Sequence, residues 1–364
     1  MRTRTILHVV GARPNYMKVA PLIDTLRSVS EIRQVLLNTG QHYDEAMAAV
    51  FLKELSLPVP DRDLAVGSGS HAVQTAKVMI GFEEVCLEEK PDLVVVVGDV
   101  NSTVAAAFGA AKLGIPCAHV EAGLRSFDRT MPEEINRLVT DQLAEILLTP
   151  SPDADDNLRR EGIPPERIHF VGNVMVDTLM RYRPLAGFER VAGRFGIRER
   201  AYGVLTLHRP SNVDHPATFF SIAAALQKIG ETIPVIFPVH PRTRARIEAF
   251  ELGRMLDRVL LAEPLGYLDF LSLMSHAAVV LTDSGGMQEE TTVLGIPCLT
   301  LRENTERPIT LTEGTNRLVG TDTGAILEGF QQALSRTPRG RIPELWDGQA
   351  SVRIVEVFRK FLRQ

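Results

Sequence analysis

Short apolar runs rich in β-branched residues recur along the chain, each followed by a turn and then by a longer segment of mixed polarity. Leu93–Val97 and His276–Val280 are two of the clearest runs. Apolar runs of this length are typical of strands that are buried on both faces of a parallel sheet. The alternation of such strands with helical segments predicts an α/β fold.

The same order of elements occurs twice. An apolar strand, a turn with an acidic residue and a helix precede Leu113–Cys117 in the first half, and the same elements precede Leu294–Cys298 in the second half. Both segments read Leu-Gly-Ile-Pro-Cys and lead into another strand. The repeat predicts two similar α/β domains, each with a parallel sheet. Because ligands bind at the carboxyl ends of parallel strands, we expect two Rossmann-like α/β/α domains that face a central, ligand-binding cleft.

The remaining pattern predicts where these domains begin and end. Further strands are expected at 6–10, 35–37, 119–120, 146–148, 169–171, 204–206, 235–237, 259–261, 299–301 and 317–319. A helix is expected to follow the turn at 11–14 and to end at 26. Further helices are expected at 72–89, 134–143, 267–274, 287–294 and 351–362. Proline, glycine and charged residues mix between 181 and 201, which indicates a hinge there or just before. We therefore place the first domain at 1–175, the second at 176–345 and a terminal helical segment at 346–364.

Composition narrows the class of protein. The chain has 364 residues, of which 45% are hydrophobic and 23% charged, with a net charge of −5. These values fit a globular protein of about two domains and give no general reason to bind nucleic acid or an anionic membrane. No run approaches the roughly 18 apolar residues of a membrane-spanning helix. Three cysteines without metal-ligand spacing fit a reducing compartment, so the cytoplasm is the expected location.

The Asp283–Gly286 segment is the first candidate for ligand binding. It follows the His276–Val280 strand and precedes a helix that is expected to begin at Met287. A strand, a glycine-rich turn and a helix start together point free N–H groups at an anion. The glycines would allow another group to approach the backbone closely. Gln288, Glu289 and Glu290 lie in the first turns of the helix, so at least one carboxylate should reach the site, where a carboxylate suits ribose hydroxyls.

Polar side chains follow most of the other predicted strands. In the first half these are Arg13, His42, Asp99 and Glu121, with Glu133 a short loop later, and in the second half they are His208, His240, Ser284 and Arg307. Carboxylates with a histidine suit proton transfer, whereas arginines and helix N-termini suit phosphate. Lys18 follows Arg13 by about one helical turn, so both could reach one anion. No group of histidines and acids shows metal-ligand spacing, so no metal is expected.

Several of these residues also have a structural interpretation, which the sequence leaves open. Glu121 could form a local ion pair with Arg125. Glu133 and Glu134 could be acids that the dipole of the following helix favours in its first turn. His240 could be a structural histidine before Pro241, and Asp99 could cap the helix that follows it.

Taken together, these segments resemble the non-hydrolysing UDP-N-acetylglucosamine 2-epimerases. The matching segments run in order along nearly the whole chain: Gly11–Pro14 with Lys18, Gly98-Asp99, His119–Arg125, Pro132–Glu134 with Asn136-Arg137, His208-Arg209, Asp283–Gly286 with Gln288–Glu290, and Thr305–Pro308. The resemblance implies the GT-B fold, a terminal helix that packs back on the first domain, and a homodimer. It implies reversible epimerisation at C2 of UDP-GlcNAc to UDP-ManNAc without a cofactor, in support of bacterial cell-surface polysaccharide synthesis.

Site residues carry over from this family by matching position. The resemblance implies that Arg13, Lys18, Ser284, Gly285, Gly286, Glu290 and Arg307 bind UDP, that Phe270 lies near the uracil, and that Asp99, Glu121, Glu133 and His208 form the catalytic group. We also include His240 among the residues expected to bind the substrate. In this mechanism UDP is eliminated to leave 2-acetamidoglucal and then adds back with C2 inverted. Two proton-transfer groups are needed, and clustered Asp99, Glu121 and Glu133 would raise one another's pKa.

Other readings of the same residues stay open. The alternatives are a hydrolysing 2-epimerase, a 2-epimerase of a modified UDP-sugar, a GT-B glycosyltransferase and a catalytically inactive nucleotide-sugar sensor. In several bacterial members the substrate also binds as an activator, through a Gln-His-x-x-Met segment and a later arginine. Here Gln41-His42 is followed by 43–46 without that methionine, and Gly67–Ser70 lacks the arginine, so activation by substrate is not expected.

Overall fold

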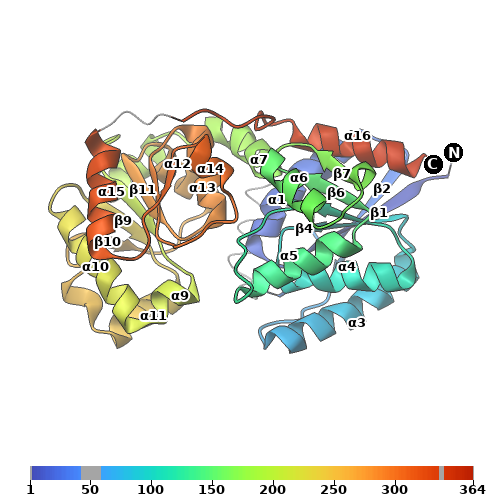
Figure 1. The fold of residues 1–364 in the computed structure, drawn as a ribbon, viewed down its shortest axis with the longest axis horizontal. Helices are drawn as coiled ribbons and strands as arrows, with labels where there is room; N and C mark the ends of the chain where they lie inside the picture. The colour runs from blue at the N-terminus through green and yellow to red at the C-terminus, as the bar shows by residue number, and fades with distance from the viewer. Residues whose placement is uncertain (1, 42–58, 336–339, 364) are drawn as a thin grey trace. The chain divides into compact units, whose positions relative to one another are not determined.

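The computed structural model describes residues 2–41, 59–335 and 340–363, and the chain divides into two compact units. Unit 1 comprises Met1–Arg181 and Glu344–Gln364, and unit 2 comprises Tyr182–Pro343. Each unit is a parallel α/β structure with its own sheet (Figure 1). This confirms the predicted α/β class.

Unit 1 has a seven-stranded sheet in the order β3-β2-β1-β4-β5-β6-β7, in which every strand pair is parallel. Its strands are β1 (Arg4–Val10), β2 (Ile32–Asn38), β3 (Arg62–Asp63), β4 (Leu93–Val97), β5 (Cys117–Val120), β6 (Ile146–Thr149) and β7 (Ile168–Phe170). Its helices are α1 (Arg13–Leu26), α3 (His71–Glu89), α4 (Asn101–Leu113), α5 (Pro132–Leu143), α6 (Pro152–Arg160), α7 (Val174–Tyr182, whose last residue enters unit 2) and α16 (Ala350–Leu362), with a short 3-10 helix at Pro165–Arg167.

Unit 2 has a six-stranded parallel sheet in the order β10-β9-β8-β11-β12-β13. Its strands are β8 (Gly203–Thr206), β9 (Val235–Pro238), β10 (Val259–Ala262), β11 (Val279–Thr282), β12 (Cys298–Thr300) and β13 (Asn316–Leu318). Its helices are α8 (Glu189–Phe195), α9 (Pro210–Val213), α10 (Pro216–Gly230), α11 (Pro241–Ala249), α12 (Tyr267–Ser275), α13 (Gly285–Leu294), α14 (Ile309–Thr312) and α15 (Thr323–Ser335), with short 3-10 helices at Arg183–Leu185 and Leu252–Arg254.

Both sheets reverse their strand order at one point. In unit 1 the order runs outward in both directions from the neighbours β1 and β4, and in unit 2 from β8 and β11. Because parallel crossovers are right-handed, this reversal places α1 with α16 on one face of the first sheet and α3, α4 and α5 on the other. Ligands of such sheets bind where the order reverses, beyond the carboxyl ends of the strands. Each unit therefore has one preferred edge for a site.

The repeated Leu-Gly-Ile-Pro-Cys segment ends a helix in the same way in both units. Gly114 follows α4 with φ of 67°, and Gly295 follows α13 with φ of 69°. The next residue in each case, Ile115 or Ile296, donates its backbone N–H to a carbonyl five residues earlier. This is the Schellman arrangement, which favours glycine because a side chain is strained in the left-handed region. The sequence repeat therefore reflects two equivalent strand–helix–strand units.

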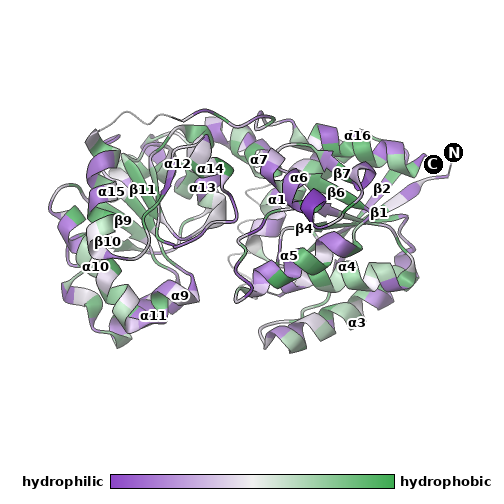
Figure 2. Ribbon diagram, viewed as in Figure 1, coloured by the Kyte–Doolittle hydropathy of each residue, from purple (hydrophilic) through white to green (hydrophobic). Residues whose placement is uncertain are grey.

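Apolar strands form the centre of each unit. In Figure 2 the strands are mostly green, whereas the helices that flank them alternate between green and purple. Val94, Val95 and Val96 of β4 are fully buried, as are Val279 and Val280 of β11. No helix among the described residues is long and apolar enough to cross a membrane. The three thiols of Cys86, Cys117 and Cys298 are free and buried.

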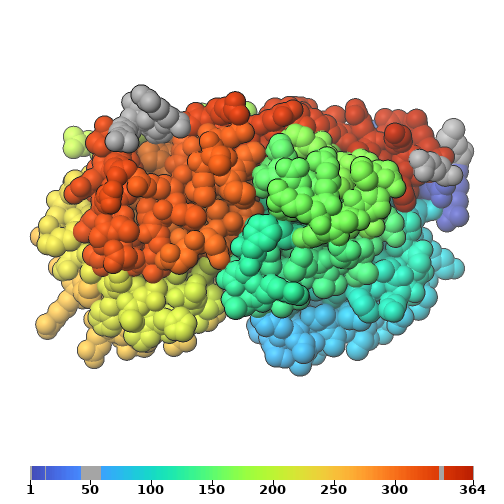
Figure 3. Space-filling view, viewed as in Figure 1, coloured from blue at the N-terminus to red at the C-terminus, as the bar shows by residue number. Residues whose placement is uncertain are grey.

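The terminal helix belongs to unit 1, although unit 2 precedes it in the chain. Asp177 accepts the backbone N–H groups of Ala350 (3.0 Å) and Ser351 (2.7 Å) at the start of α16. Just before the helix, the indole N–H of Trp346 donates to the carbonyl of Pro150 at 2.8 Å. Figure 3 shows this red segment covering the top of unit 1. These polar contacts fix the helix against unit 1.

Candidate active site

In unit 1 two carboxylate residues, Asp99 and Glu121, follow the neighbouring strands β4 and β5. Val97 of β4 pairs with Val120 of β5, so the residues that follow both strands leave the sheet at the same level. Gly98 has φ of 67° and Glu121 has φ of 73°. Left-handed backbone is strained for a glutamate, and such strain is concentrated at functional positions. Asp99 and Glu121 therefore begin adjacent loops at the edge where ligands bind.

Glu121 is paired with Lys18 of α1. The Lys18 ammonium lies 2.8 Å from the carboxylate, and the two side chains are only 7% and 3% exposed. Gly98 lies against this cation. A Cβ added at Gly98 would lie 2.8 Å from the Lys18 nitrogen, so a side chain there would crowd the ammonium group. The structure thus places Lys18 at the acid group. The sequence had suggested that Lys18 and Arg13 share an anion, and the side chain of Arg13 lies outside the described part of the structure.

Asp99 also has a cationic partner. Arg137 of α5 forms an ion pair with its carboxylate, and Asn136 donates to its backbone carbonyl at 2.9 Å. The N-cap residue of the helix that follows is Val100, and the first-turn backbone N–H of Ser102 donates to the side chain of Gln41 at 3.0 Å, so Asp99 is not the N-cap residue. A cation beside Asp99 and another beside Glu121 oppose the mutual repulsion that a cluster of bare carboxylates would have.

Glu133 and Glu134 both lie in the first turn of α5, where the helix dipole favours acids, and Glu134 is the buried one of the two. It is 1% exposed and accepts the backbone N–H groups of Ser126 (2.9 Å) and Phe127 (3.0 Å). Burial alone would raise its pKa, but these hydrogen bonds and Arg137 hold the pKa of Glu134 below its usual value. Glu133 is partly exposed on the same helical turn. Its carboxylate is thereby left for another role.

A buried polar network lies behind the two carboxylates. The ring of His119 contacts Asp141 through Nδ1 at 2.6 Å and the carbonyl of Gly98 through Nε2 at 2.8 Å. Each ring nitrogen of His119 therefore faces an oxygen atom of a buried partner. Asp141 also accepts from Arg125 at 2.7 Å, and Arg125 in turn reaches Glu161 at 2.6 Å. Arg125 thus pairs with Asp141 and Glu161, and the proposed local pair with Glu121 is wrong.

In unit 2 a buried aspartate orients His208. Asp283 is fully buried, and its carboxylate lies 2.8 Å from Nδ1 of His208, whose side chain is 56% exposed. It also accepts the backbone N–H groups of His208 at 3.0 Å and Arg209 at 2.9 Å. Burial would raise the pKa of Asp283, but His208 and these hydrogen bonds hold it below the usual value. The second ring nitrogen of His208 is thereby left to face outward.

Three guanidiniums surround Glu306 near the start of α13. Its carboxylate lies 2.7 Å from Arg307, 2.8 Å from Arg302 and 3.4 Å from Arg209. Burial opposes ionisation, yet Arg307, Arg302 and Arg209 outweigh it and hold the pKa of Glu306 far below its usual value. Arg307 also contacts Glu289 at 2.7 Å. A group of arginines at a helix N-terminus suits a phosphate or diphosphate.

The two glycines of the Asp283–Gly286 segment lie inside α13, which begins at Gly285. The prediction that they form a turn before a helix at Met287 is therefore wrong, and neither is among the glycines of positive φ. Gly285 is required for another reason. A Cβ there would lie 2.3 Å from Arg307 and 2.7 Å from Glu306. Ser284 is the N-cap residue, without a side-chain capping bond.

The other candidates of unit 2 lie on helices around this edge. Glu290 is 5% exposed and accepts the hydroxyl of Tyr267 at 3.2 Å. Burial, and then the carboxylate of Glu290, raise the pKa of Tyr267 well above its usual value. Phe270 lies one turn further along α12 and is partly buried. His240 accepts the backbone N–H of Arg242 at 3.3 Å as the N-cap of α11, which is the structural role that the sequence had left open.

Some residues that complete the site were not singled out from the sequence. These are Arg137, Asp141, Asp283 as a partner of His208, Arg209, Arg302, Glu306 and Tyr267, all placed by the contacts above. Arg137, Asp283, Arg209 and Glu306 lie within the matching segments, so only their roles were missed. His42 and the 43–46 segment lie outside the described residues.

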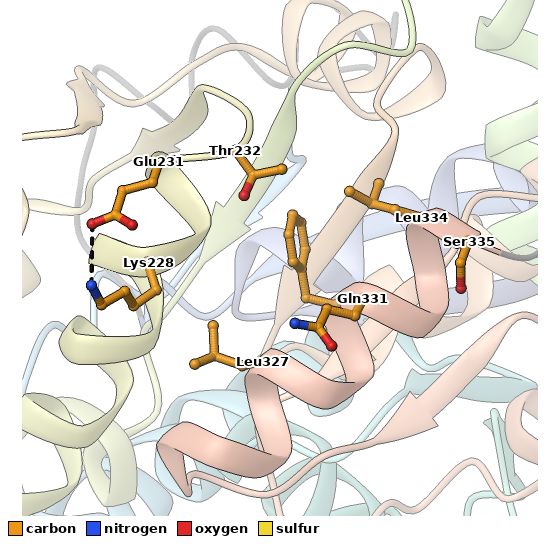
Figure 4. A pocket seen from close by; sticks show the side chains of 8 residues that line it. Lys228, Glu231, Thr232, Leu327, Gln331, Leu334 and Ser335 are labelled. Atoms are coloured by element: carbon orange, nitrogen blue, oxygen red, sulfur yellow. Dashed lines mark hydrogen bonds and ion pairs between the residues drawn. The ribbon is translucent and has the colours of Figure 1, made fainter.

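A hollow of unit 2 lies away from these groups. It is bordered by Lys228 in the last turn of α10, by Glu231 and Thr232 just after that helix, and by Leu327, Gln331, Leu334 and Ser335 of α15 (Figure 4). Thr232 precedes β9, so the hollow lies at the amino ends of the strands. Apart from the exposed Lys228–Glu231 pair (3.3 Å), its lining is mostly uncharged. It therefore does not compete with the arginine group as a nucleotide site.

The chemistry that these groups support differs between the units. Unit 1 presents carboxylates held beside cations, which suit proton transfer. Unit 2 presents arginines, a helix N-terminus and a histidine on a buried aspartate, which suit a diphosphate and its developing charge. Unit 2 also holds a carboxylate and a tyrosine on neighbouring helices, which suit hydroxyl groups.

The chain is similar to known 2-epimerases of nucleotide sugars. The family model described as UDP-N-acetylglucosamine 2-epimerase matches residues 24–359. A UDP-N-acetylglucosamine 2-epimerase of Methanocaldococcus jannaschii is 43% identical over 96% of this chain and 97% of its own length. A UDP-2,3-diacetamido-2,3-dideoxy-D-glucuronate 2-epimerase of Pseudomonas aeruginosa is 40% identical over 98% of this chain and 99% of its own.

Solved structures give the same result. The crystal structure of the Methanocaldococcus jannaschii UDP-GlcNAc 2-epimerase in complex with UDP-GlcNAc and UDP aligns with a TM-score of 0.89 at 41% identity, over 98% of this chain and 99% of that one. The fold is therefore of the GT-B class, as the sequence predicted. With a family model that spans most of the chain and relatives of this identity over nearly their whole length, the chain belongs to the UDP-N-acetylglucosamine 2-epimerase family.

Proposed function

We propose that this enzyme interconverts UDP-GlcNAc and UDP-ManNAc by eliminating UDP and adding it back. A base removes the proton at C2, the electron pair forms the C1–C2 double bond, and the C1–O bond breaks to release UDP. Addition of UDP to the resulting 2-acetamidoglucal returns a proton to C2 from the opposite face. Family membership and the presence of UDP-GlcNAc in the Methanocaldococcus jannaschii complex support this substrate.

The observation that carries the proposal is the pair of carboxylates beyond β4 and β5. Asp99 and Glu121 leave adjacent strands in strained or glycine-preceded backbone, and each has a cation within ion-pair distance. Reversal at C2 needs an acid and a base on opposite faces of the sugar, so two such groups are required. Glu133 is proposed as the third member, and His208 on Asp283 as a group that contacts the diphosphate or relays a proton.

We assign the binding of the nucleotide to residues of unit 2 around the start of α13. Arg307, Ser284, Gly285 and Gly286 are proposed to hold the diphosphate at the start of α13. Glu290 is proposed to bind the ribose, and Phe270 and His240 to lie near the base and the substrate. Departure of UDP builds negative charge on the phosphates, which arginines and a helix N-terminus stabilise. We also propose that the enzyme is a cytoplasmic homodimer.

A modified UDP-sugar is the second candidate substrate. The Pseudomonas aeruginosa relative that acts on a UDP-diacetamido-glucuronate is 40% identical, close to the 43% of the UDP-GlcNAc enzyme. Both sugars would undergo the same elimination, because the change lies at other carbons than C2.

Turnover in D₂O tests the reaction and the sugar together. UDP-GlcNAc and UDP-2,3-diacetamido-2,3-dideoxy-glucuronate are each incubated with the purified protein and followed by NMR. We expect both epimers of UDP-GlcNAc to carry deuterium at C2. Epimers without deuterium would exclude the elimination, and turnover of the diacetamido sugar alone would select the second candidate. Accumulation of free ManNAc with UDP would indicate the hydrolysing relative.

Two variants connect this reaction to the carboxylates. Glu121→Gln retains the side-chain shape but loses the titrating group, so turnover should fall by the roughly 10²–10⁴-fold typical of general acid–base loss. Glu356→Gln on the exposed surface of α16 is the matched control and should keep the wild-type rate. Equal rates for the two variants would remove Glu121 from the mechanism.

A further inference from the structure

Two buried side chains of unit 1 form a polar pair that takes no direct part in the proposed reaction. His119 of β5 and Asp141 of α5 are both 0% exposed, and Nδ1 of the ring lies 2.6 Å from the carboxylate. Taking such groups out of water costs free energy, and apolar side chains of similar volume often stabilise a core at least as well. The stability of unit 1 therefore does not by itself explain this pair.

One end of the pair holds the peptide from which Asp99 begins. Nε2 of His119 donates to the carbonyl of Gly98 at 2.8 Å, and the backbone N–H of Gly98 donates to the carbonyl of Val120 at 3.1 Å. The peptide bond is planar, so a fixed Gly98 carbonyl also fixes the orientation of the Asp99 nitrogen. Glycine has the widest range of backbone conformations, so external hydrogen bonds are needed to keep one of them. The ring of His119 thus restrains the residue that leads into Asp99.

The other end of the pair holds the loop that begins with Glu121. One carboxylate oxygen of Asp141 faces the ring of His119, and the other accepts the backbone N–H of Gly123 at 3.1 Å. A Cβ at Gly123 would lie 2.4 Å from a backbone carbonyl oxygen of α6, so this segment has little room to shift. The loops that begin with Asp99 and Glu121 are therefore bound to the two ends of one buried pair.

Helix α5 reaches Asp99 by a second route. Arg137 lies one helical turn before Asp141 on the same face of α5 and forms an ion pair with the Asp99 carboxylate. Arg137 therefore holds the carboxylate, while Asp141 acts through His119 on the peptide that precedes it. Two restraints on one acidic residue from one face of a helix indicate that the pair serves the position of Asp99 and not only the packing of α5.

We propose that His119 and Asp141 are positioning residues, which set the separation and orientation of the Asp99 and Glu121 carboxylates. The proposal rests on the proton-transfer roles proposed for those two acids. Proton removal from one face of C2 and return to the other require both groups in a fixed geometry, and a misplacement of about 1 Å can lower a rate by roughly 10²-fold. The nucleotide is assigned to unit 2, so loss of the pair should lower kcat and leave UDP affinity unchanged.

Two substitutions at one position separate the contacts of the ring. The amide nitrogen of an asparagine lies close to the place of Nδ1 in histidine, and that of a glutamine close to the place of Nε2. His119→Gln can therefore keep the hydrogen bond to Gly98, whereas His119→Asn can keep only the contact with Asp141. We expect His119→Asn to lower kcat by about 10²-fold and His119→Gln to recover about tenfold of that loss, with the KM for UDP-GlcNAc within about threefold of wild type in both.

A second buried histidine of the same sheet supplies the matched control. His8 of β1 is also 0% exposed, but its ring contacts the side chain of Gln34 at 3.1 Å. His8→Gln alters a buried imidazole to the same extent, so it should change the melting temperature and keep the wild-type kcat. A loss of kcat in His8→Gln as large as that in His119→Asn would show that the effect is general to the sheet, and it would overturn the positioning role.

Isotope labelling separates misplaced acids from a general loss of folded protein. Solvent deuterium can enter C2 from either face during turnover of UDP-GlcNAc in D₂O. The initial ratio of deuterated UDP-GlcNAc to deuterated UDP-ManNAc therefore reports on how the two acids are placed relative to each other. A loss of folded protein lowers both products together and leaves this ratio unchanged. We expect His119→Asn and Asp141→Asn to change the ratio, and Asp141→Asn alone decides if the His119 variants do not fold.

Glu121→Gln, measured in the same assay, keeps the positioning role and the proposed mechanism apart. If Glu121→Gln is slow while His119→Asn and Asp141→Asn keep the wild-type kcat or the wild-type labelling ratio, the positioning role is refuted and the role of the acids stands. A wild-type rate in Glu121→Gln would remove the proposed mechanism and the positioning role with it.

Discussion

The ion pair of Lys18 and Glu121 joins a residue assigned to the nucleotide with one assigned to proton transfer. Both side chains are almost fully buried, so removal of one leaves the other without its counter-charge. Breaking a buried pair in this way costs about 3–5 kcal/mol. If Lys18 serves Glu121, its loss affects the chemical step. If it serves the diphosphate, its loss affects UDP binding.

We expect Lys18→Met to lower turnover by at least 10²-fold and to change the dissociation constant of UDP by less than about threefold, with a lower melting temperature. Adding Glu121→Gln should recover stability, because no buried charge is then left unpaired, while turnover stays low. Lys228→Met, which breaks an exposed pair, is the control. Calorimetry and steady-state assays separate the two roles, and weakened UDP binding with normal turnover would assign Lys18 to the nucleotide.

Individual side chains beyond the strands could be located from the sequence, but their partners could not. Glu121 and Lys18 are 103 residues apart, Asp99 and Arg137 are 38 apart, and His208 and Asp283 are 75 apart. An apolar run followed by a polar residue marks a strand end within a short window of sequence. Which cation meets which acid depends on the strand order, and that order is set by the tertiary packing.

At the scale of elements, the sequence predicts the position of the Asp283–Gly286 segment correctly but predicts the wrong local structure for it, a turn where α13 begins. A Gly-Gly pair after a strand is typical of a turn, yet both glycines lie in the helix. Gly285 is needed there because Arg307 and Glu306 occupy the space where its side chain would lie. That constraint comes from residues more than twenty positions later. Helices α10 and α15 were not predicted. In α10 apolar residues occupy most sides, so its helical period is weak.

Gly285→Ala should therefore displace Arg307 and weaken UDP binding by at least tenfold, with little change in the circular dichroism spectrum. The reason is steric, since the new methyl group would lie 2.3 Å from the guanidinium. Gly193→Ala in α8 is the matched control, because no atom lies within 4 Å of a Cβ at that helical position. It should leave UDP affinity unchanged. If calorimetry gives the same affinity for Gly285→Ala and wild type, Arg307 does not hold the diphosphate.

At the scale of the whole molecule, a histidine in the first sheet makes stability depend on pH. His8 of β1 is fully buried, and burial lowers its pKa from 6.5 to about 4, despite a hydrogen bond with Gln34 that favours the charged form. Between these two values the unfolded chain binds more protons than the folded one. Stability is therefore lost as the pH falls from about 6.5 toward 4.

This histidine alone should remove about 2 kcal/mol from the free energy of unfolding of unit 1 between pH 7 and pH 5. Urea unfolding of the wild type and of His8→Leu at both values measures the effect. Whatever its stability at pH 7, His8→Leu should lose less on acidification than the wild type does. An equal loss in both proteins would show that other groups dominate the pH dependence.

The place of α16 in unit 1 has a consequence for the order in which the protein is made. Ribosomes extend the chain from its amino terminus, so residues 344–364 leave the exit tunnel only after all of unit 2. Unit 2 is one continuous stretch and can fold as soon as it emerges, whereas unit 1 waits for the last segment. Its α1 surface, including the Thr25 hydroxyl that contacts Ser351 at 3.1 Å, stays uncovered during that time. The unit synthesised first is thus completed last.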